Sequence, residues 1–239
     1  MKNDRLKVLR AWTVHFYTSL GIPIGFFALL AVFAGKAQLV FILLGLATII
    51  DGTDGTLARR WNVLRWASRF DGRKLDDITD YINYTFIPII FIYRFELIPR
   101  AWVPVLLFVL ISSVYGFCQT QAKTDDGFFT GFPSYWNIVA FYFYFINGNP
   151  ALNAVILVIL GLMVFIPTKY ISTKTHQFRN LSLGLTVLWL VMALYILARF
   201  DNVDIRLVYG SLFFPIYYMV TSFYLHFQAK AGKLPVFEH

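Results

Sequence analysis

The sequence predicts an all-α integral membrane protein with about eight transmembrane helices. Of its 239 residues, 58% are hydrophobic and only 14% are charged, whereas about a quarter of the residues in soluble domains are charged. Aromatic residues make up 19% of the chain and the mean hydropathy is +0.62, so the apolar surface exceeds what one small core could bury. Apolar runs long enough to cross about 30 Å of hydrocarbon recur along the whole chain.

The first apolar run follows a short basic segment, and no small-residue cleavage site ends it, so it is expected to stay as a membrane span. The longest polar interval, residues 59–75, contains several large apolar side chains and is expected to lie at the lipid headgroups. No repeat or linker separates the runs, which predicts a single transmembrane domain over residues 1–239. The eight predicted spans cover residues 11–34, 37–57, 76–98, 101–121, 133–147, 151–168, 181–199 and 205–227.

The basic residues predict the orientation of these spans. If every run crosses the membrane, 16 of the 21 Lys and Arg residues lie on one side, together with both chain ends. By the positive-inside rule, both termini are expected to be cytoplasmic. The net charge of +8 then reflects topology, and a nucleic-acid partner is not expected, because the cations are scattered over short loops. One cysteine and four dispersed histidines without zinc-like spacing argue against a zinc enzyme.

Six aspartates fall within residues 51–80, at the end of the second predicted span and the start of the third. An ionised carboxylate costs roughly 2.5 to 3.5 kcal/mol at the bilayer centre, so this placement requires a compensating interaction. At 100° per residue, one helical stripe carries two acids and two small residues, with a guanidinium beside it. These residues are Asp51, Asp54, Gly55, Ala58 and Arg59.

The third span presents a second acidic stripe, with Asp76, Asp80 and Asn83 on one side and Gly72 one turn earlier, while Asp77 points further away. Two antiparallel helices of this kind can form a cup of four carboxylates, whose hard oxygen ligands suit Mg²⁺ or Mn²⁺. The small residues leave a cavity and Arg59 offers donors for phosphate. A site for a divalent metal and a phosphate group within a membrane protein indicates transfer of a phosphoryl group on a lipid. A simpler alternative is that the acids only pair with neighbouring Lys and Arg side chains at the headgroups.

Residues 51–59, DGTDGTLAR, and residues 72–80, GRKLDDITD, resemble the signature of the CDP-alcohol phosphatidyltransferase family. That signature is D-x-x-D-G-x-x-A-R, a spacer, and then G-x-x-x-D-x-x-x-D. The spacer here, residues 60–71, is longer than in most members, and Gly52 follows the first aspartate, as in the branch of the family that uses choline. Every fixed position is present, at Asp51, Asp54, Gly55, Ala58, Arg59, Gly72, Asp76 and Asp80.

The resemblance implies a six-helix core in a homodimer, with the additional spans at its periphery. It implies transfer of the phosphatidyl group of CDP-diacylglycerol to choline, with release of CMP and a requirement for Mn²⁺ or Mg²⁺. Direct displacement is our own hypothesis, because His15 and His226 lie in other spans and no residue suggests a covalent phosphoenzyme. The expected location is a bacterial inner membrane, with the active site at the cytoplasmic face. A two-metal centre would be held by Asp51, Asp54, Asp76 and Asp80, with Asp80 as the base. The residues expected to bind CDP-diacylglycerol are Asp54, Gly55, Ala58, Arg59 and Gly72.

A quaternary ammonium group accepts no hydrogen bonds and is usually held over aromatic faces. The aromatic candidates at the level of the acidic cluster are Tyr84, one turn after Asp80, and Tyr135 and Trp136 at the start of the fifth predicted span. Asn83 and Asn137 are expected to orient the choline.

Three alternatives remain open on the sequence. The acceptor could be serine, inositol, glycerol phosphate or another alcohol, because the metal and CDP positions are common to the family. Acidic residues within spans also occur in cation transporters. A structural membrane protein with an acidic docking patch is the third alternative.

Overall fold

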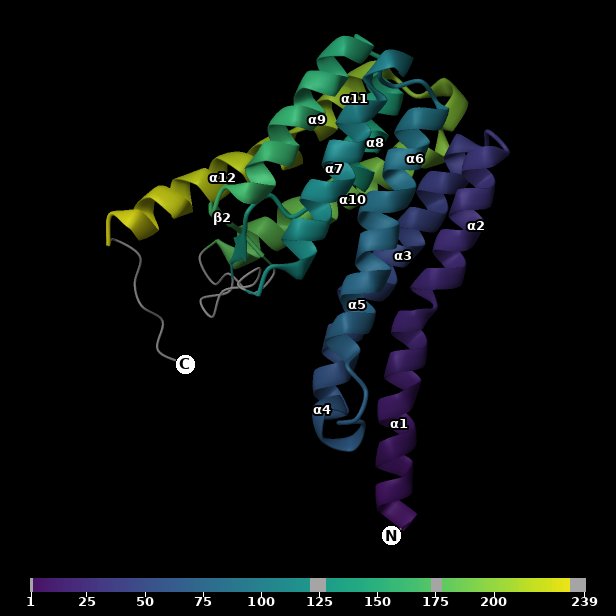
Figure 1. Cartoon of the computed structure of the whole chain (residues 1–239), viewed down its shortest axis with the longest axis vertical. Helices are drawn as coiled ribbons and strands as arrows, with labels where there is room; N and C mark the ends of the chain where they lie inside the picture. The colour runs from purple at the N-terminus through teal and green to yellow at the C-terminus, as the bar shows by residue number, and fades with distance from the viewer. Residues whose placement is uncertain (1, 121–127, 173–177, 233–239) are drawn as a thin grey trace. The chain divides into compact units, whose positions relative to one another are not determined.

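Helices form nearly all of the regular structure in the computed structural model (Figure 1), which describes residues 2–120, 128–172 and 178–232. The all-α expectation is therefore confirmed, apart from one two-stranded ladder. The chain divides into two compact units, Met1–Phe95 and Glu96–His239. The helices of the first unit are α1 (Lys2–Ser19), α2 (Gly21–Phe33), α3 (Ala37–Arg60), α4 (Val63–Trp66), α5 (Gly72–Asp80), the π-helix η1 (Tyr81–Phe86) and α6 (Ile87–Arg94).

The first unit is a bundle of three helical rods. In Figure 1, α1 and α2 follow one another almost in line, α3 runs back beside them, and α5, η1 and α6 return along the same axis. Helix α1 ends at Ser19, four residues before Pro23, which has no N–H to donate to the Ser19 carbonyl. Gly35 (φ +69°) ends α2 with a Schellman turn in which the N–H of Lys36 donates to the Ala31 carbonyl at 2.9 Å, so α3 begins directly beside α2.

Side chains that pack α2, α3 and α6 together are mostly small or aliphatic, as is usual where membrane helices approach closely. The outward faces of α2 and α3 are also apolar and include exposed Phe26, Phe27, Ile42 and Ile49. Such faces are expected of helices whose solvent is lipid. The buried residues between the rods include Ala28, Ala31, Val32, Val40, Phe41, Leu44 and Phe91.

The second unit is built around two helix pairs, α7 with α9 and α8 with α11. Trp136 is fully buried and its indole N–H donates to Ser113 Oγ at 2.7 Å, which ties α8 to α7. Tyr142 on α8 donates to the Ser211 carbonyl of α11 at 2.9 Å. Its elements are the 3₁₀ helix η2 (Arg100–Trp102), α7 (Val103–Cys118), β1 (Phe129–Thr130), α8 (Trp136–Ile146), α9 (Pro150–Phe165), β2 (Lys169–Tyr170), α10 (Arg179–Ala198), the 3₁₀ helix η3 (Phe200–Asn202), α11 (Ile205–Ser211) and α12 (Phe213–Lys230).

Strands β1 and β2 pair antiparallel, with Phe129 opposite Tyr170. Helix α12 packs on β2, where the N–H of Ile171 donates to Ser222 Oγ and that of Lys169 donates to His226 Nδ1, both at 3.1 Å. The short ladder thus satisfies backbone groups between helices that would otherwise be unpaired.

Among the described residues, four helical segments are long and apolar enough to cross a membrane by themselves. Other predicted spans are shorter or divided: residues 76–98 comprise α5, η1 and α6, and residues 205–227 comprise α11 and most of α12. The chain is an integral membrane protein, while the number of spans and their orientation stay predictions. The four segments are Asp4–Phe33, Ala37–Arg60, Arg100–Cys118 and Arg179–Ala198.

We expect Gly131→Ala to destabilise the second unit by about 2 to 4 kcal/mol. Gly131 has φ +81°, and a Cβ there would lie 2.3 Å from the backbone carbonyl oxygen of Val164, which cannot move aside as a side chain does. The matched control is Gly184→Ala in α10, where an added Cβ meets nothing within 4 Å. Thermal unfolding in detergent should show a lower Tm for the first variant only, and equal Tm values would contradict this account.

Candidate functional site

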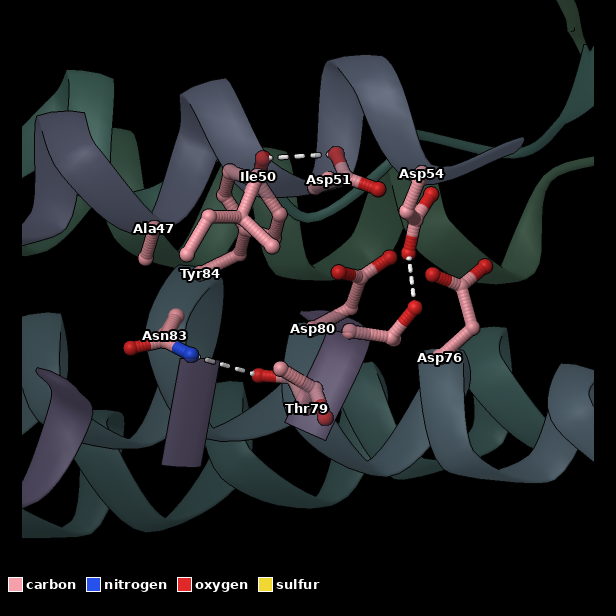
Figure 2. A pocket seen from close by; sticks show the side chains of 10 residues that line it. Ala47, Ile50, Asp51, Asp54, Asp76, Thr79, Asp80, Asn83 and Tyr84 are labelled. Carbon is pink, nitrogen blue, oxygen red and sulfur yellow. Dashed lines mark hydrogen bonds between the residues drawn. The ribbon is translucent and has the colours of Figure 1, made fainter. Parts of the chain in front are cut away.

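Four carboxylates converge between α3 and α5 in the first unit. Asp51 and Asp54 lie in the last three turns of α3, one turn apart, and Asp76 and Asp80 lie one turn apart on α5. Figure 2 shows the side chains of the two helices pointing toward one another across a pocket. The structure thus brings the four aspartates together at one pocket, and their role as metal ligands stays a prediction. The ten lining residues are Thr18, Ala47, Ile50, Asp51, Asp54, Asp76, Thr79, Asp80, Asn83 and Tyr84.

The carboxylates of α3 are held by hydroxyl donors from the two neighbouring rods. Thr18 Oγ1 on α1 donates to Asp54 Oδ2 at 2.7 Å, and Asp54 is only 6% exposed. The Tyr84 hydroxyl on η1 donates to Asp51 Oδ2, also at 2.7 Å (Figure 2). A hydrogen bond to a charged acceptor is short and stronger than one between neutral groups. These two bonds therefore fix the orientation of both α3 carboxylates.

Three of the carboxylates form a candidate metal site. One oxygen from each of Asp51, Asp76 and Asp80 lies within 4.8 Å of the other two. At that separation, two ionised carboxylates repel by about 3 kcal/mol at an effective dielectric constant of 20. A divalent cation among them would turn this repulsion into attraction, and an all-oxygen donor set suits Mg²⁺ or Mn²⁺. The residues present fit such an ion.

Local sequence features place the α5 carboxylates. Asp71 caps α5 by accepting a hydrogen bond from the Lys74 N–H at 3.0 Å, which sets where the helix begins. Directly after Asp80 the chain forms the π-helix η1, and Pro88 lies just beyond it, without the N–H that would pair with the Tyr84 carbonyl. Asn83 and Tyr84, both on η1, line the same pocket as Asp80.

Gly55, Ala58, Arg59 and Gly72 do not line this pocket, although the sequence groups them with the aspartates. Ala58 packs on the core formed by α1 and α4, and Arg59 Nη2 donates to Thr56 Oγ1 at 3.1 Å on the exposed side of α3. A Cβ on Gly72 would lie 2.7 Å from His15 Cε1, so this glycine allows α5 to approach α1 closely. Contacts of these four residues with CDP-diacylglycerol stay a prediction.

Sequence reasoning missed the contribution of α1 and α2 to the site. Thr18 lies far from the aspartates in the sequence, and no motif marks it. Gly21 and Gly25 of α2 also go unnoticed in sequence, yet a Cβ on Gly21 would lie 2.3 Å from Thr79 Cγ2 and one on Gly25 2.8 Å from Asn83 Oδ1. Asn83 Nδ2 donates to the carbonyls of Gly21 and Thr79, both at 3.0 Å. The two glycines therefore let α2 press against the acidic helix.

The candidate choline residues fall into two groups. Asn83 and Tyr84 line the acidic pocket, and the hydroxyl of Tyr84 is engaged by Asp51. The other three belong to the second unit, where Tyr135 packs edge-on against Tyr218 and Asn137 Oδ1 accepts a hydrogen bond from the Ile138 N–H. Trp136 is 0% exposed and acts there as a core side chain. Choline binding by all five residues stays a prediction.

Comparisons with known proteins identify the family to which this chain is similar. Residues 13–221 match the family model described as CDP-alcohol phosphatidyltransferase. A phosphatidylcholine synthase of Pseudomonas aeruginosa is 35% identical over 213 residues, which cover 88% of this chain and 89% of that protein. One from Borreliella burgdorferi is 34% identical over 96% of this chain and 99% of its own length. One from Legionella pneumophila is 33% identical over 90% of this chain and 88% of its own length.

We expect Asp51→Asn and Asp80→Asn each to weaken Mn²⁺ binding at least tenfold, because each removes a charged oxygen ligand from the cluster. Isothermal titration of the purified protein with MnCl₂ measures this effect. Asp77→Asn is the control, since Asp77 lies on the same helix but outside the cluster. Weakening of the same size in the Asp77 variant would show that general negative charge, and not a defined site, attracts the ion.

Proposed function

The chain belongs to the CDP-alcohol phosphatidyltransferase family, and from this membership we propose that it transfers the phosphatidyl group of CDP-diacylglycerol to choline. The products are phosphatidylcholine and CMP. The observation that carries the choice of choline is the similarity, over most of both chains, to several proteins named phosphatidylcholine synthase. The acidic pocket between α3 and α5 supports the reaction class, because transfer of a charged phosphoryl group requires charge neutralisation.

Asp51, Asp54, Asp76 and Asp80 would hold the metal ions, two in our proposal, with Mn²⁺ or Mg²⁺ as the candidates. When bound, such ions neutralise the diphosphate and stabilise the charge on departing CMP. Thr18 and Tyr84 contribute by holding Asp54 and Asp51 in fixed orientations through their 2.7 Å hydrogen bonds. This preorganisation means that the ligand oxygens need not reorient during the reaction.

Asp80 is our candidate for the general base. Its carboxylate points into the pocket from the last residue of α5 (Figure 2). The choline hydroxyl is a weak nucleophile at neutral pH and needs a base within hydrogen-bond reach. As the choline oxygen bonds to the phosphorus that carries diacylglycerol, its proton passes to Asp80. The bond from that phosphorus to the oxygen of CMP breaks in the same displacement.

The proposed setting is a bacterial inner membrane with the acidic pocket open to the cytoplasm. Support comes from the excess of Lys and Arg on the predicted inner side of the chain. We also propose a homodimer in which about eight spans surround a six-helix core, as the family resemblance implies. Gly55, Ala58, Arg59 and Gly72 would contact CDP-diacylglycerol at the edge of the pocket.

Reconstituted protein with CDP-diacylglycerol and Mn²⁺ should release CMP when choline is added. Serine, inositol and glycerol 3-phosphate should release at least tenfold less. Asp80→Asn should lower kcat by about 10² to 10⁴, the range for loss of a general base, while Asp77→Asn should keep most of the activity. CMP release with a different alcohol would retain the family assignment and reject choline as the acceptor.

Tyr84 allows its two proposed contributions to be separated. Tyr84→Phe removes the donor to Asp51 but keeps the aromatic face, so kcat should fall about tenfold with little change in KM for choline. Tyr84→Leu also removes the ring, and a higher KM for choline in this variant alone would support cation–π binding. Unchanged kinetics in both variants would exclude Tyr84 from the site.

A further inference from the structure

A second pocket in the first unit has the opposite charge to the acidic one and shares no lining residue with it. It lies between the N-terminal half of α1 and the junction of α3 with α4. Its empty volume is about 590 Å³, including the part that is open to solvent. Four cations and two indole rings dominate its walls, and among the residues that the structure describes no carboxylate lines it. Its lining residues are Lys7, Arg10, Arg60, Trp61, Asn62, Arg65 and Trp66.

The walls of this basic pocket are fixed by a hydrophobic core directly beside it. Lys7 and Arg10 recur at helical spacing with Val14, which is 2% exposed, so both cations lie on the face of α1 that packs against the chain. Val14 joins Ala11, Val63 and Ala67 in a buried cluster, and Trp61 and Trp66 pack against it. The basic side chains therefore project from a rigid support.

Cation–π contacts hold two of these side chains in place. Lys7 Nζ lies 4.8 Å from the centre of the Trp66 ring, and the Arg65 guanidinium lies 5.0 Å from the same centre. Asp4 pairs with Lys7 at 3.6 Å from outside the pocket, and both side chains are about half exposed, so this ion pair is weak. A ligand thus meets cations that are already positioned, which lowers the entropy lost on binding.

Helix lengths place the pocket at the level of lipid phosphates. Helices α2 and α3 are joined by a three-residue turn, so Phe33 and Ala37 lie at one level. Arg10 lies 23 residues before Phe33, and Arg60 lies 23 residues after Ala37. At 1.5 Å per residue, each arginine is about 35 Å from the far end of its rod, just beyond a hydrocarbon layer about 30 Å thick.

The outward side of the same region is apolar, as expected for a surface against lipid. Leu9, Trp12 and Phe16 form an exposed stripe along α1 on the side away from the pocket, and Leu64 on α4 is 93% exposed. Indole rings are also enriched at this depth of a membrane, where one edge meets lipid and the other meets polar groups.

We propose that the basic pocket binds the phosphate group of an anionic phospholipid. The planar guanidinium group of arginine donates bidentate hydrogen bonds to phosphate oxygens, and three arginines line this pocket at the proposed headgroup depth. Leu64, which is 93% exposed and precedes Arg65 in the chain, offers an apolar contact beside the pocket for the acyl chains. This site is separate from the acidic pocket, and its ligand is a component of the surrounding bilayer.

Native mass spectrometry of the full-length protein tests the proposal, with phosphatidylglycerol, phosphatidylcholine and inorganic phosphate as separate probes. Phosphatidylglycerol should bind at least tenfold more tightly than phosphatidylcholine. The pocket variant R10Q/R60Q/R65Q should lower its affinity at least tenfold. The control variant R69Q/R73Q/K74Q removes the same charge from exposed positions between α4 and the start of α5, outside the pocket, and should retain wild-type affinity.

Three results would overturn the proposal: equal affinity for the two lipids, equal loss in both variants, or displacement of phosphatidylglycerol by millimolar inorganic phosphate. The last result would identify a soluble anion as the ligand. If the triple variant does not fold, Arg60→Gln alone tests the same point, with an expected loss of about fivefold for one charge near the membrane surface. A photoactivatable anionic lipid should attach to residues 7–10 or 60–66 in the wild-type protein, and attachment elsewhere would also reject the site.

Discussion

The convergence of four carboxylates between α3 and α5 is the constraint on which the architecture of the first unit depends. Asp51 lies nine residues before Arg60, or about 14 Å further along α3, so with Arg60 at the proposed headgroup level these charges would sit below it. Ionised groups at such depth are costly unless they find donors or cations. The structure supplies hydroxyl donors to Asp51 and Asp54 from two different rods. The site therefore requires three rods to meet.

Close approach of those rods is achieved with small residues. Gly21 and Gly25 bring α2 against the acidic helix, and Gly72 brings the start of α5 against His15. At each of the three positions an added Cβ would come within 3 Å of a side chain on another rod. Tyr84, on the π-helix η1 of the third rod, donates its hydroxyl to Asp51 across the site. The close packing of the three rods therefore also sets the geometry of the site in this unit.

Charge is arranged in two layers along the first unit. The deeper layer is acidic and suits cations and the phosphoryl chemistry that they support. The shallower layer is basic, lies at the expected depth of lipid phosphates and is walled by indole rings. In a membrane enzyme of this family, such layering would keep the reacting carboxylates and the surrounding anionic lipids apart.

The sequence by itself determined the fold class and the family and predicted that four aspartates lie on two neighbouring helical stripes, because hydropathy and helical spacing can be followed along the chain without tertiary contacts. It also indicated that Asn83 and Tyr84 lie near the acids, since they follow Asp80 within one turn. Only the tertiary structure decided that Thr18 holds Asp54, that Gly72 faces His15, and that Lys7 and Arg10 meet Arg60 and Arg65. These contacts join segments far apart in the chain. Their partners depend on how the rods rotate and slide against one another, which periodicity along a single helix does not specify.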